Sequence, residues 1–161
     1  MIALLAMSSF FSATETSFSA LNRTRLKNMA EKGNKRAAAA LKLSENYDSL
    51  LSSILVGNNI VNISLASIGT VLFVDLMASS SGPTVSTIVC TVVVLIFGEI
   101  TPKSIAKEMP ESFAMAVTPI MRVLLVILKP INAIFSGWKK LLCRVFHFEN
   151  DRTFSQDELL T

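Results

Sequence analysis

The sequence predicts an all-α membrane protein with three transmembrane helices and further helices at the membrane surface. Of its 161 residues, 51% are hydrophobic and only 17% are charged, whereas soluble domains typically have about 25% charged residues. Residues 49–74 and 76–98 contain no charged side chain. Each run exceeds the roughly 20 residues that a helix needs to cross a hydrocarbon core about 30 Å thick. The chain is therefore expected to be integral to a membrane.

The first span is expected at residues 1–21, which are apolar and carry one charge, Glu15. A cleaved signal peptide would begin with basic residues, and no Lys or Arg precedes Arg23. The second span is expected at residues 49–77 and the third at residues 84–102, with a short uncharged loop between them. These three segments form the predicted transmembrane helices.

The basic segment 22–48 sets the predicted orientation. It contains seven Lys or Arg residues, and cytoplasmic loops are enriched in such residues. The N-terminus is then expected outside the cell, and the chain returns to the cytoplasm near Lys103 and Lys107. We expect a multi-pass protein of the cell (inner) membrane, with a helical, amphipathic connection at 22–48 and a cytoplasmic C-terminus.

Residues 112–138 are apolar but contain charged residues and prolines. If they crossed the membrane, the basic residues that follow, Lys139 and Lys140 among them, would lie outside, against the distribution of charge. Helices that lie on the inner interface, or a re-entrant pair, are preferred for 104–146. Trp138, before two lysines, fits an interfacial anchor.

Polar residues inside the spans are the candidate functional groups. The candidates are Ser12, Glu15, Thr16 and Ser19 in the first span, Asn58 and Asn62 in the second, and Gly98 and Glu99 in the third. Within each of the first two spans they share one helical face. Pro102 deprives the Gly98 carbonyl of its usual helical donor. A rise of 1.5 Å per residue places all three groups between mid-depth and the inner half of the bilayer.

These groups offer hydroxyl, amide, backbone carbonyl and carboxylate oxygens, without thiol or imidazole. Such donors suit hard cations, namely Mg²⁺, Ca²⁺ or Na⁺. The alternative is that these residues have a structural role. Ser and Thr in membrane helices often donate hydrogen bonds to backbone carbonyls, and the Glu99 side chain could extend to the membrane interface. Cys90, Cys143 and His147 are interpreted as packing or incidental residues.

Three stretches resemble a known family: Phe-Ser-Ala-Thr-Glu-Thr-Ser-Phe-Ser-Ala-Leu-Asn at 11–22, Gly-Asn-Asn-Ile-Val-Asn at 57–62 and Phe-Gly-Glu-Ile-Thr-Pro-Lys at 97–103. Together they resemble the transmembrane domain of the CNNM/CorC magnesium transporters, in particular the bacterial CorC branch. The resemblance implies a homodimer with three crossing helices, a belt helix and Mg²⁺ held by neutral oxygens. By position it implies these ligands: Ser12, Thr16, Asn58, the Gly98 carbonyl and Glu99, followed by Asn62, Glu15 and Ser19.

The resemblance also implies Mg²⁺ export, coupled to Na⁺ entry, by residues 1–146. Residues 147–161 are then expected to begin a cytoplasmic linker to a CBS-pair domain, through which alone ATP would act. The alternative is a regulatory scaffold that senses Mg²⁺ without moving it. An enzyme is not expected, since neither HExxH nor GxSxG occurs. A net charge of +3 gives no indication of nucleic-acid binding, so the expected partners are the bilayer and a second copy.

Overall fold

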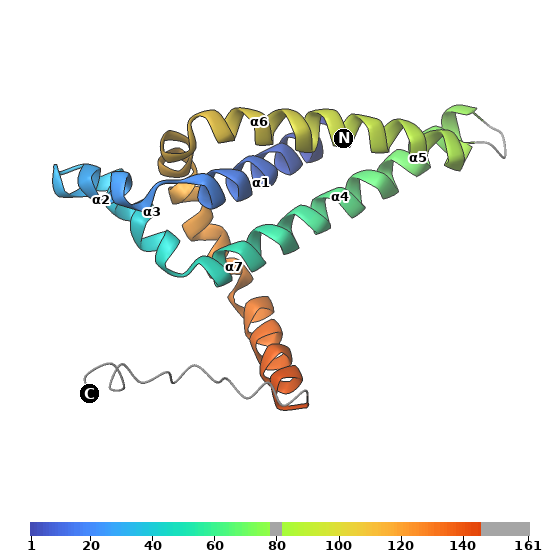
Figure 1. Ribbon diagram of the computed structural model, residues 1–161. Coiled ribbons are helices and arrows are strands. Elements are labelled where there is room, and N and C mark those ends of the chain that lie inside the picture. Colours follow the sequence, from blue (N-terminus) through green and yellow to red (C-terminus); the bar gives the residue numbers. More distant parts are fainter. Residues whose placement is uncertain (78–81, 146–161) are drawn as a thin grey trace, which may run out of the picture. The chain divides into compact units, whose positions relative to one another are not determined.

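The computed structural model describes the backbone of residues 1–77 and 82–145, and the side chains of these ranges as far as Leu128. The described part is helical and contains no strand. Its elements are α1 (Ile2–Ala20), α2 (Arg23–Glu31), α3 (Lys35–Glu45), α4 (Tyr47–Met77), α5 (Gly82–Val93), the π-helix η1 (Val94–Ile100), α6 (Thr101–Glu108) and α7 (Pro110–Val145) (Figure 1). The chain divides into two units, Met1–Leu128 and Lys129–Thr161. The expectations for Trp138, Cys143, His147 and the linker lie outside the described side chains.

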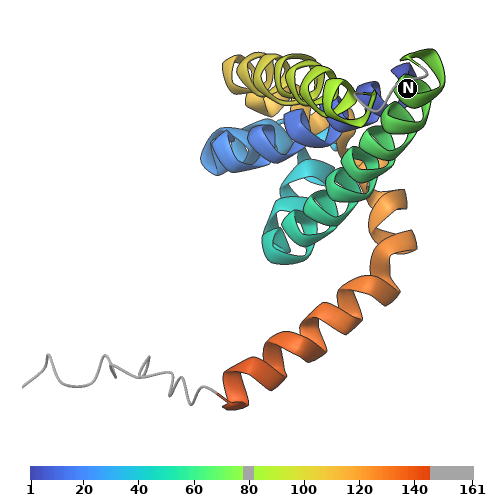
Figure 2. The same ribbon diagram turned by 90° about the vertical axis from the view of Figure 1, so that its right-hand side faces the viewer.

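Two long helical stretches form the scaffold of the first unit. One is α4, and the other is the continuous run of α5, η1 and α6. The two run in opposite directions: α5 packs against α4, and the stretches diverge toward α6, where α1 lies between them (Figures 1 and 2). The helix α1 packs against α4, η1 and α6. The three segments with candidate ligands are therefore neighbours in space, as a shared site requires.

Three helices in the described part are long and apolar enough to cross a membrane: Tyr47–Met77, Gly82–Glu108 and Pro110–Leu128. The all-α membrane fold is thus confirmed, and the first two helices contain the residues of the predicted second and third spans, 49–77 and 84–102. The helix α1 is not among them, because seven hydroxyl residues and Glu15 in its 19 residues lower its hydropathy. By length and composition Pro110–Leu128 also qualifies, although the sequence places it at the interface; both assignments stay predictions.

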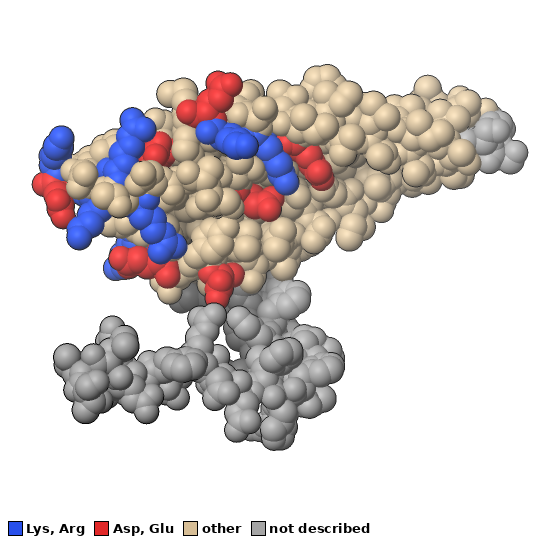
Figure 3. Space-filling model, viewed as in Figure 1, with Lys and Arg blue, Asp and Glu red and all other residues tan. Residues whose placement is uncertain are grey.

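The surface of α4 and α5 is suited to lipid. Large side chains such as Ile63, Val71 and Ile88 are 60–67% exposed, which would be unfavourable in water but is expected against acyl chains. On the face shown in Figure 3, charged residues gather over α2, α3 and α6, and the end formed by α4 and α5 shows none. On this face the charged residues and the apolar surface thus lie at opposite ends.

The predicted helical connection folds as the hairpin of α2 and α3. Gly33, at φ +92°, makes the turn, a backbone conformation that glycine adopts at little cost. The Asn34 side chain then caps α3 by accepting from two backbone N–H groups. Leu26 of α2 packs on Ala37 and Ala40 of α3, and all three are fully buried. Packing at these positions gives the basic segment a defined structure.

The start of α7 is tied to the junction of α1 and α2 by a buried carboxylate. Glu111 is 8% exposed. It accepts from the Asn22 backbone N–H at 3.3 Å and lies 3.7 Å from an Arg25 nitrogen. Beyond it, Ala114 and Met121 of α7 join the apolar core of the unit.

Candidate functional site

Three side-chain oxygens from α1 and α4 converge inside the bundle. The hydroxyl of Ser8, fully buried, donates to Oδ1 of Asn62 at 2.7 Å and lies within 3.3 Å of Oδ1 of Asn58. A hydroxyl carries a single proton, so the two amide oxygens share one donor. These three oxygens lie close together, and only one proton is available to their lone pairs. The remaining lone pairs could bind a cation.

The π-helix η1 presents a backbone carbonyl to the same helix, α1. At its end the N–H of Thr101 donates to the carbonyl of Ile96, five residues back. In the same pattern Pro102, which has no N–H, leaves the carbonyl of Phe97 without its helical donor. The Ser9 hydroxyl lies 2.7 Å from that carbonyl oxygen. The π geometry thus shifts the carbonyl affected by Pro102 from Gly98, the predicted position, to Phe97, and π-helical turns often occur at functional sites.

Gly98 allows this helix to approach Ser8 closely. A Cβ at Gly98 would lie 3.0 Å from the Ser8 hydroxyl oxygen and 3.5 Å from its Cβ. Gly98 is buried, and small residues permit such close approach of membrane helices. The Gly98 backbone therefore borders the Ser8–Asn58–Asn62 cluster, while its role as a carbonyl ligand stays a prediction.

Replacing Gly98 with alanine is expected to displace the Ser8 hydroxyl and weaken ion binding about tenfold, in the range of changes to residues that orient ligands. The measurement is the affinity of the purified protein for Mg²⁺ by isothermal titration calorimetry. Combining Gly98→Ala with Ser8→Gly relieves the steric conflict but removes the hydroxyl. Near-normal affinity of the single variant would contradict the proposed position of Ser8 in the site.

Ser12 lies one turn further along α1, on the face of Ser8. Its hydroxyl oxygen is fully buried and has no hydrogen-bond partner among the described residues. Buried polar groups are nearly always paired, and an exception usually marks a water, an ion or a functional role. Of the predicted ligands on α1, Ser12 is thus the one whose surroundings favour a bound species.

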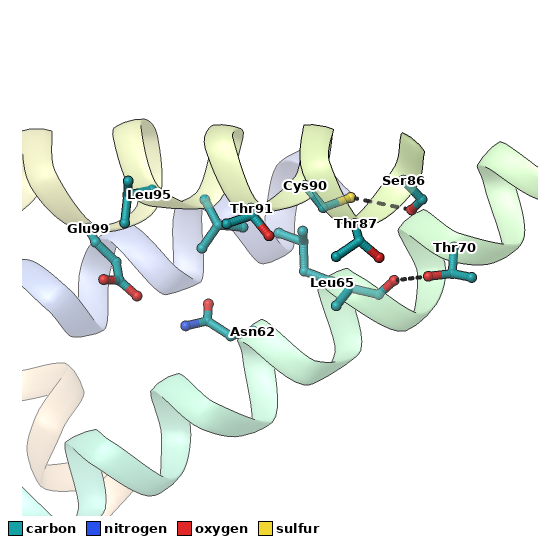
Figure 4. A pocket seen from close by; sticks show the side chains of 11 residues that line it. Asn62, Leu65, Thr70, Ser86, Thr87, Cys90, Thr91, Leu95 and Glu99 are labelled. Carbon is teal, nitrogen blue, oxygen red and sulfur yellow. Dashed lines mark hydrogen bonds between the residues drawn. The ribbon is translucent and has the colours of Figure 1, made fainter. Parts of the chain in front are cut away.

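A groove of about 250 Å³ opens between α4 and the α5–η1 helix. Asn62 and Glu99 point into it from opposite sides (Figure 4). Thr87 and Thr70 line the groove, and each donates its hydroxyl to a carbonyl of its own helix, which leaves the oxygen lone pairs available. Asn62 contacts both the buried Ser8 and this groove, so it connects the two compartments.

Other predicted ligands have different partners. Ser19 is exposed, and its hydroxyl lies 2.7 Å from the Tyr47 hydroxyl. Glu15 is 3.3 Å from the ammonium of Lys103. Thr16 is half-buried on the same helix. In the described part there is no group of three or more His, Cys, Asp or Glu residues suited to a metal.

Sequence reasoning missed Ser8 and Ser9. Ser8 precedes Ser12 by four residues and extends the predicted stripe by one turn, so helical spacing alone could have identified it. Ser9 carried no such signal, because its role depends on the π geometry of another helix.

Comparison with known proteins agrees with this architecture. A family model described as the cyclin M transmembrane N-terminal domain matches residues 1–161. The chain is 35% identical over 159 residues to the UPF0053 inner membrane protein YfjD of Escherichia coli (strain K12), covering 96% of this chain and 37% of that protein. It is 36% identical over 162 residues to a UPF0053 protein of Haemophilus influenzae, covering 99% and 38%.

A further relative is the polyamine export protein of Escherichia coli (strain K12), 28% identical over 157 residues, with 90% of this chain and 35% of that protein covered. The chain spans less than two-fifths of the length of these relatives. The match over its whole length confirms the resemblance seen in the motifs: the chain belongs to the cyclin M transmembrane N-terminal domain family and forms a multi-pass membrane domain.

Proposed function

We propose that this domain transports Mg²⁺ across the cell membrane, in the outward direction and coupled to Na⁺ entry. The observation that supports it best is the convergence of the Ser8, Asn58 and Asn62 oxygens. The buried hydroxyl of Ser12, unpartnered among the described residues, lies one helical turn further along α1. Mg²⁺ takes oxygen ligands and dehydrates reluctantly, so a few protein oxygens beside retained waters suit it. Direction and coupling rest on the family resemblance alone.

The arrangement favours reversible binding. Neutral amide and hydroxyl oxygens hold a divalent ion less tightly than carboxylates would, and conduction requires binding weak enough for release. Glu99, half-buried on the groove, supplies a negative charge on the path to Asn62. An ion bound by these three oxygens would require the Ser8 proton to turn away from the amide oxygens.

The experiment is Mg²⁺ flux in proteoliposomes that contain the purified protein, with an Mg²⁺-sensitive dye and an imposed Na⁺ gradient. Wild-type protein is expected to move Mg²⁺, and Asn58→Ala to lower the rate at least tenfold. Asn59→Ala is the matched control, because Asn59 is exposed on the same helix and should leave flux unchanged.

Two other outcomes discriminate the rival functions. Mg²⁺ binding by the wild-type protein without flux would favour the sensing scaffold. Flux of a radiolabelled polyamine in place of Mg²⁺ would assign to this chain the activity named for its Escherichia coli relative. Either result, or normal transport by Asn58→Ala, would contradict the proposal.

A further inference from the structure

A second pocket lies away from the proposed ion site, between α3 and α7. Its volume is about 490 Å³. Three of its lining residues are cations, namely Lys35, Arg36 and Arg122, and none is acidic. The remaining lining residues are Ala39, Met115, Ala116, Thr118 and Pro119. Cations concentrated in one concave site indicate an anionic ligand.

The backbone adds to the positive potential of this pocket. Lys35 and Arg36 occupy the first turn of α3, and no acidic residue lies in that turn. The N-terminus of a helix carries a partial positive charge, so two like charges there are unfavourable without an anion nearby. The ion pairs in the described part are Arg25–Glu111 and Lys103–Glu15, and neither neutralises a pocket cation.

The apolar surface next to the pocket identifies the anion as part of a lipid. Val123 follows Arg122 in α7 and is 61% exposed. Further along α7, Val126 and Ile127 are each 63% exposed. A free phosphate would gain nothing from this surface, whereas acyl chains would cover it. We propose that the pocket binds the phosphate headgroup of an anionic phospholipid, whose chains lie along the exposed face of α7.

The same geometry bears on the depth of α7. Arg122 lies inside an apolar stretch of 19 residues, Pro110–Leu128, and a charged side chain at the bilayer centre is costly. In this pocket Arg122 shares one anion with the basic start of α3, a segment too polar to enter the hydrocarbon. Arg122 is thereby placed at headgroup level, and basic pockets between helices at this level bind anionic headgroups in other membrane proteins.

The test measures lipid retained by the purified full chain, using native mass spectrometry after detergent exchange from membranes of defined composition. Wild-type protein is expected to retain phosphatidylglycerol or cardiolipin and not phosphatidylcholine. The variant Lys35→Gln/Arg36→Gln/Arg122→Gln is expected to bind the anionic lipid on the order of 100-fold more weakly. This figure assumes that each cation contributes about 1 kcal/mol to the binding of an anionic lipid, where about 1.4 kcal/mol corresponds to a tenfold change in affinity.

The matched control is Lys27→Gln/Lys32→Gln/Lys42→Gln, which removes equal charge from exposed positions outside the pocket. It should retain lipid like the wild type. Equal loss in both variants would show a diffuse electrostatic effect and overturn the proposal. Equal retention of phosphatidylcholine by the wild-type protein would also overturn the proposal. So would an equal stabilisation of the protein by inorganic phosphate, added in phosphatidylcholine, and by the anionic lipid.

The single variant Arg122→Gln keeps the proposal falsifiable if the triple variant fails to fold. It should retain less anionic lipid than the wild-type protein and more than the triple variant. None of these readouts involves Mg²⁺, so this inference and the proposed transport can fail independently.

Discussion

Replacing Gly57 with leucine is expected to separate α1 from α4 and to lower the stability of the bundle by about 1–3 kcal/mol or more, the usual cost of overpacking a filled core. A Cβ at Gly57 would lie 2.5 Å from Cζ and 2.7 Å from Cε1 of the Phe11 ring. Phe11 is 3% exposed and sits in the core with Leu50 and Ile54. A leucine side chain would therefore require the ring or one of the two helices to move.

The measurement is thermal unfolding of the detergent-solubilised protein, followed by circular dichroism. The double variant Gly57→Leu/Phe11→Ala should recover much of the stability, because leucine then occupies the volume that the ring vacates. Asn59→Leu, on the exposed side of α4, is the control and should change little. A Gly57→Leu variant as stable as the wild type would show that the two helices are not packed as described.

The sequence predicted the helices because their cause is local. Runs without charge, such as 49–74, are long enough to span a bilayer, and the stripe of Asn58 and Asn62 follows from helical periodicity. The hairpin of α2 and α3 was foreseeable only in part: basic and alanine-rich residues indicated a helix, but not where Gly33 would divide it. These features depend on neighbours in the chain.

The candidate site was predictable to a smaller extent, since it depends on pairs of residues far apart in sequence. Nothing near Gly57 reveals that Phe11 will lie against it. Glu15 looked like a ligand by its position on the stripe, but Lys103, 88 residues later, pairs with it. The π-helix was also not predictable from nearby residues. Pro102 removes the donor of the carbonyl five residues before it in a π-helix, but four residues before it in an α-helix.

Replacing Asn62 with alanine is expected to have the largest effect on transport, a loss of about 10- to 100-fold in Mg²⁺ affinity with a corresponding fall in flux. Asn62 accepts the 2.7 Å hydrogen bond from Ser8 and also lines the groove with Glu99. Its removal takes away an ion ligand and leaves the buried Ser8 hydroxyl with only the longer contact to Asn58, at 3.3 Å. Calorimetry and proteoliposome flux measure the two consequences separately.

Asn62→Asp provides the decisive comparison for that residue. The added charge should bind Mg²⁺ more tightly than the amide does and release it more slowly, so affinity rises while turnover falls. Ser67→Ala, which removes a hydroxyl bonded only to the Ile63 carbonyl of its own helix, should alter neither quantity. If Asn62→Ala binds and transports normally, the connection between the buried oxygens and the groove is not the ion path. If Asn62→Asp loses affinity, the oxygens do not act as ligands of a cation, since a carboxylate in the same place would strengthen any such site.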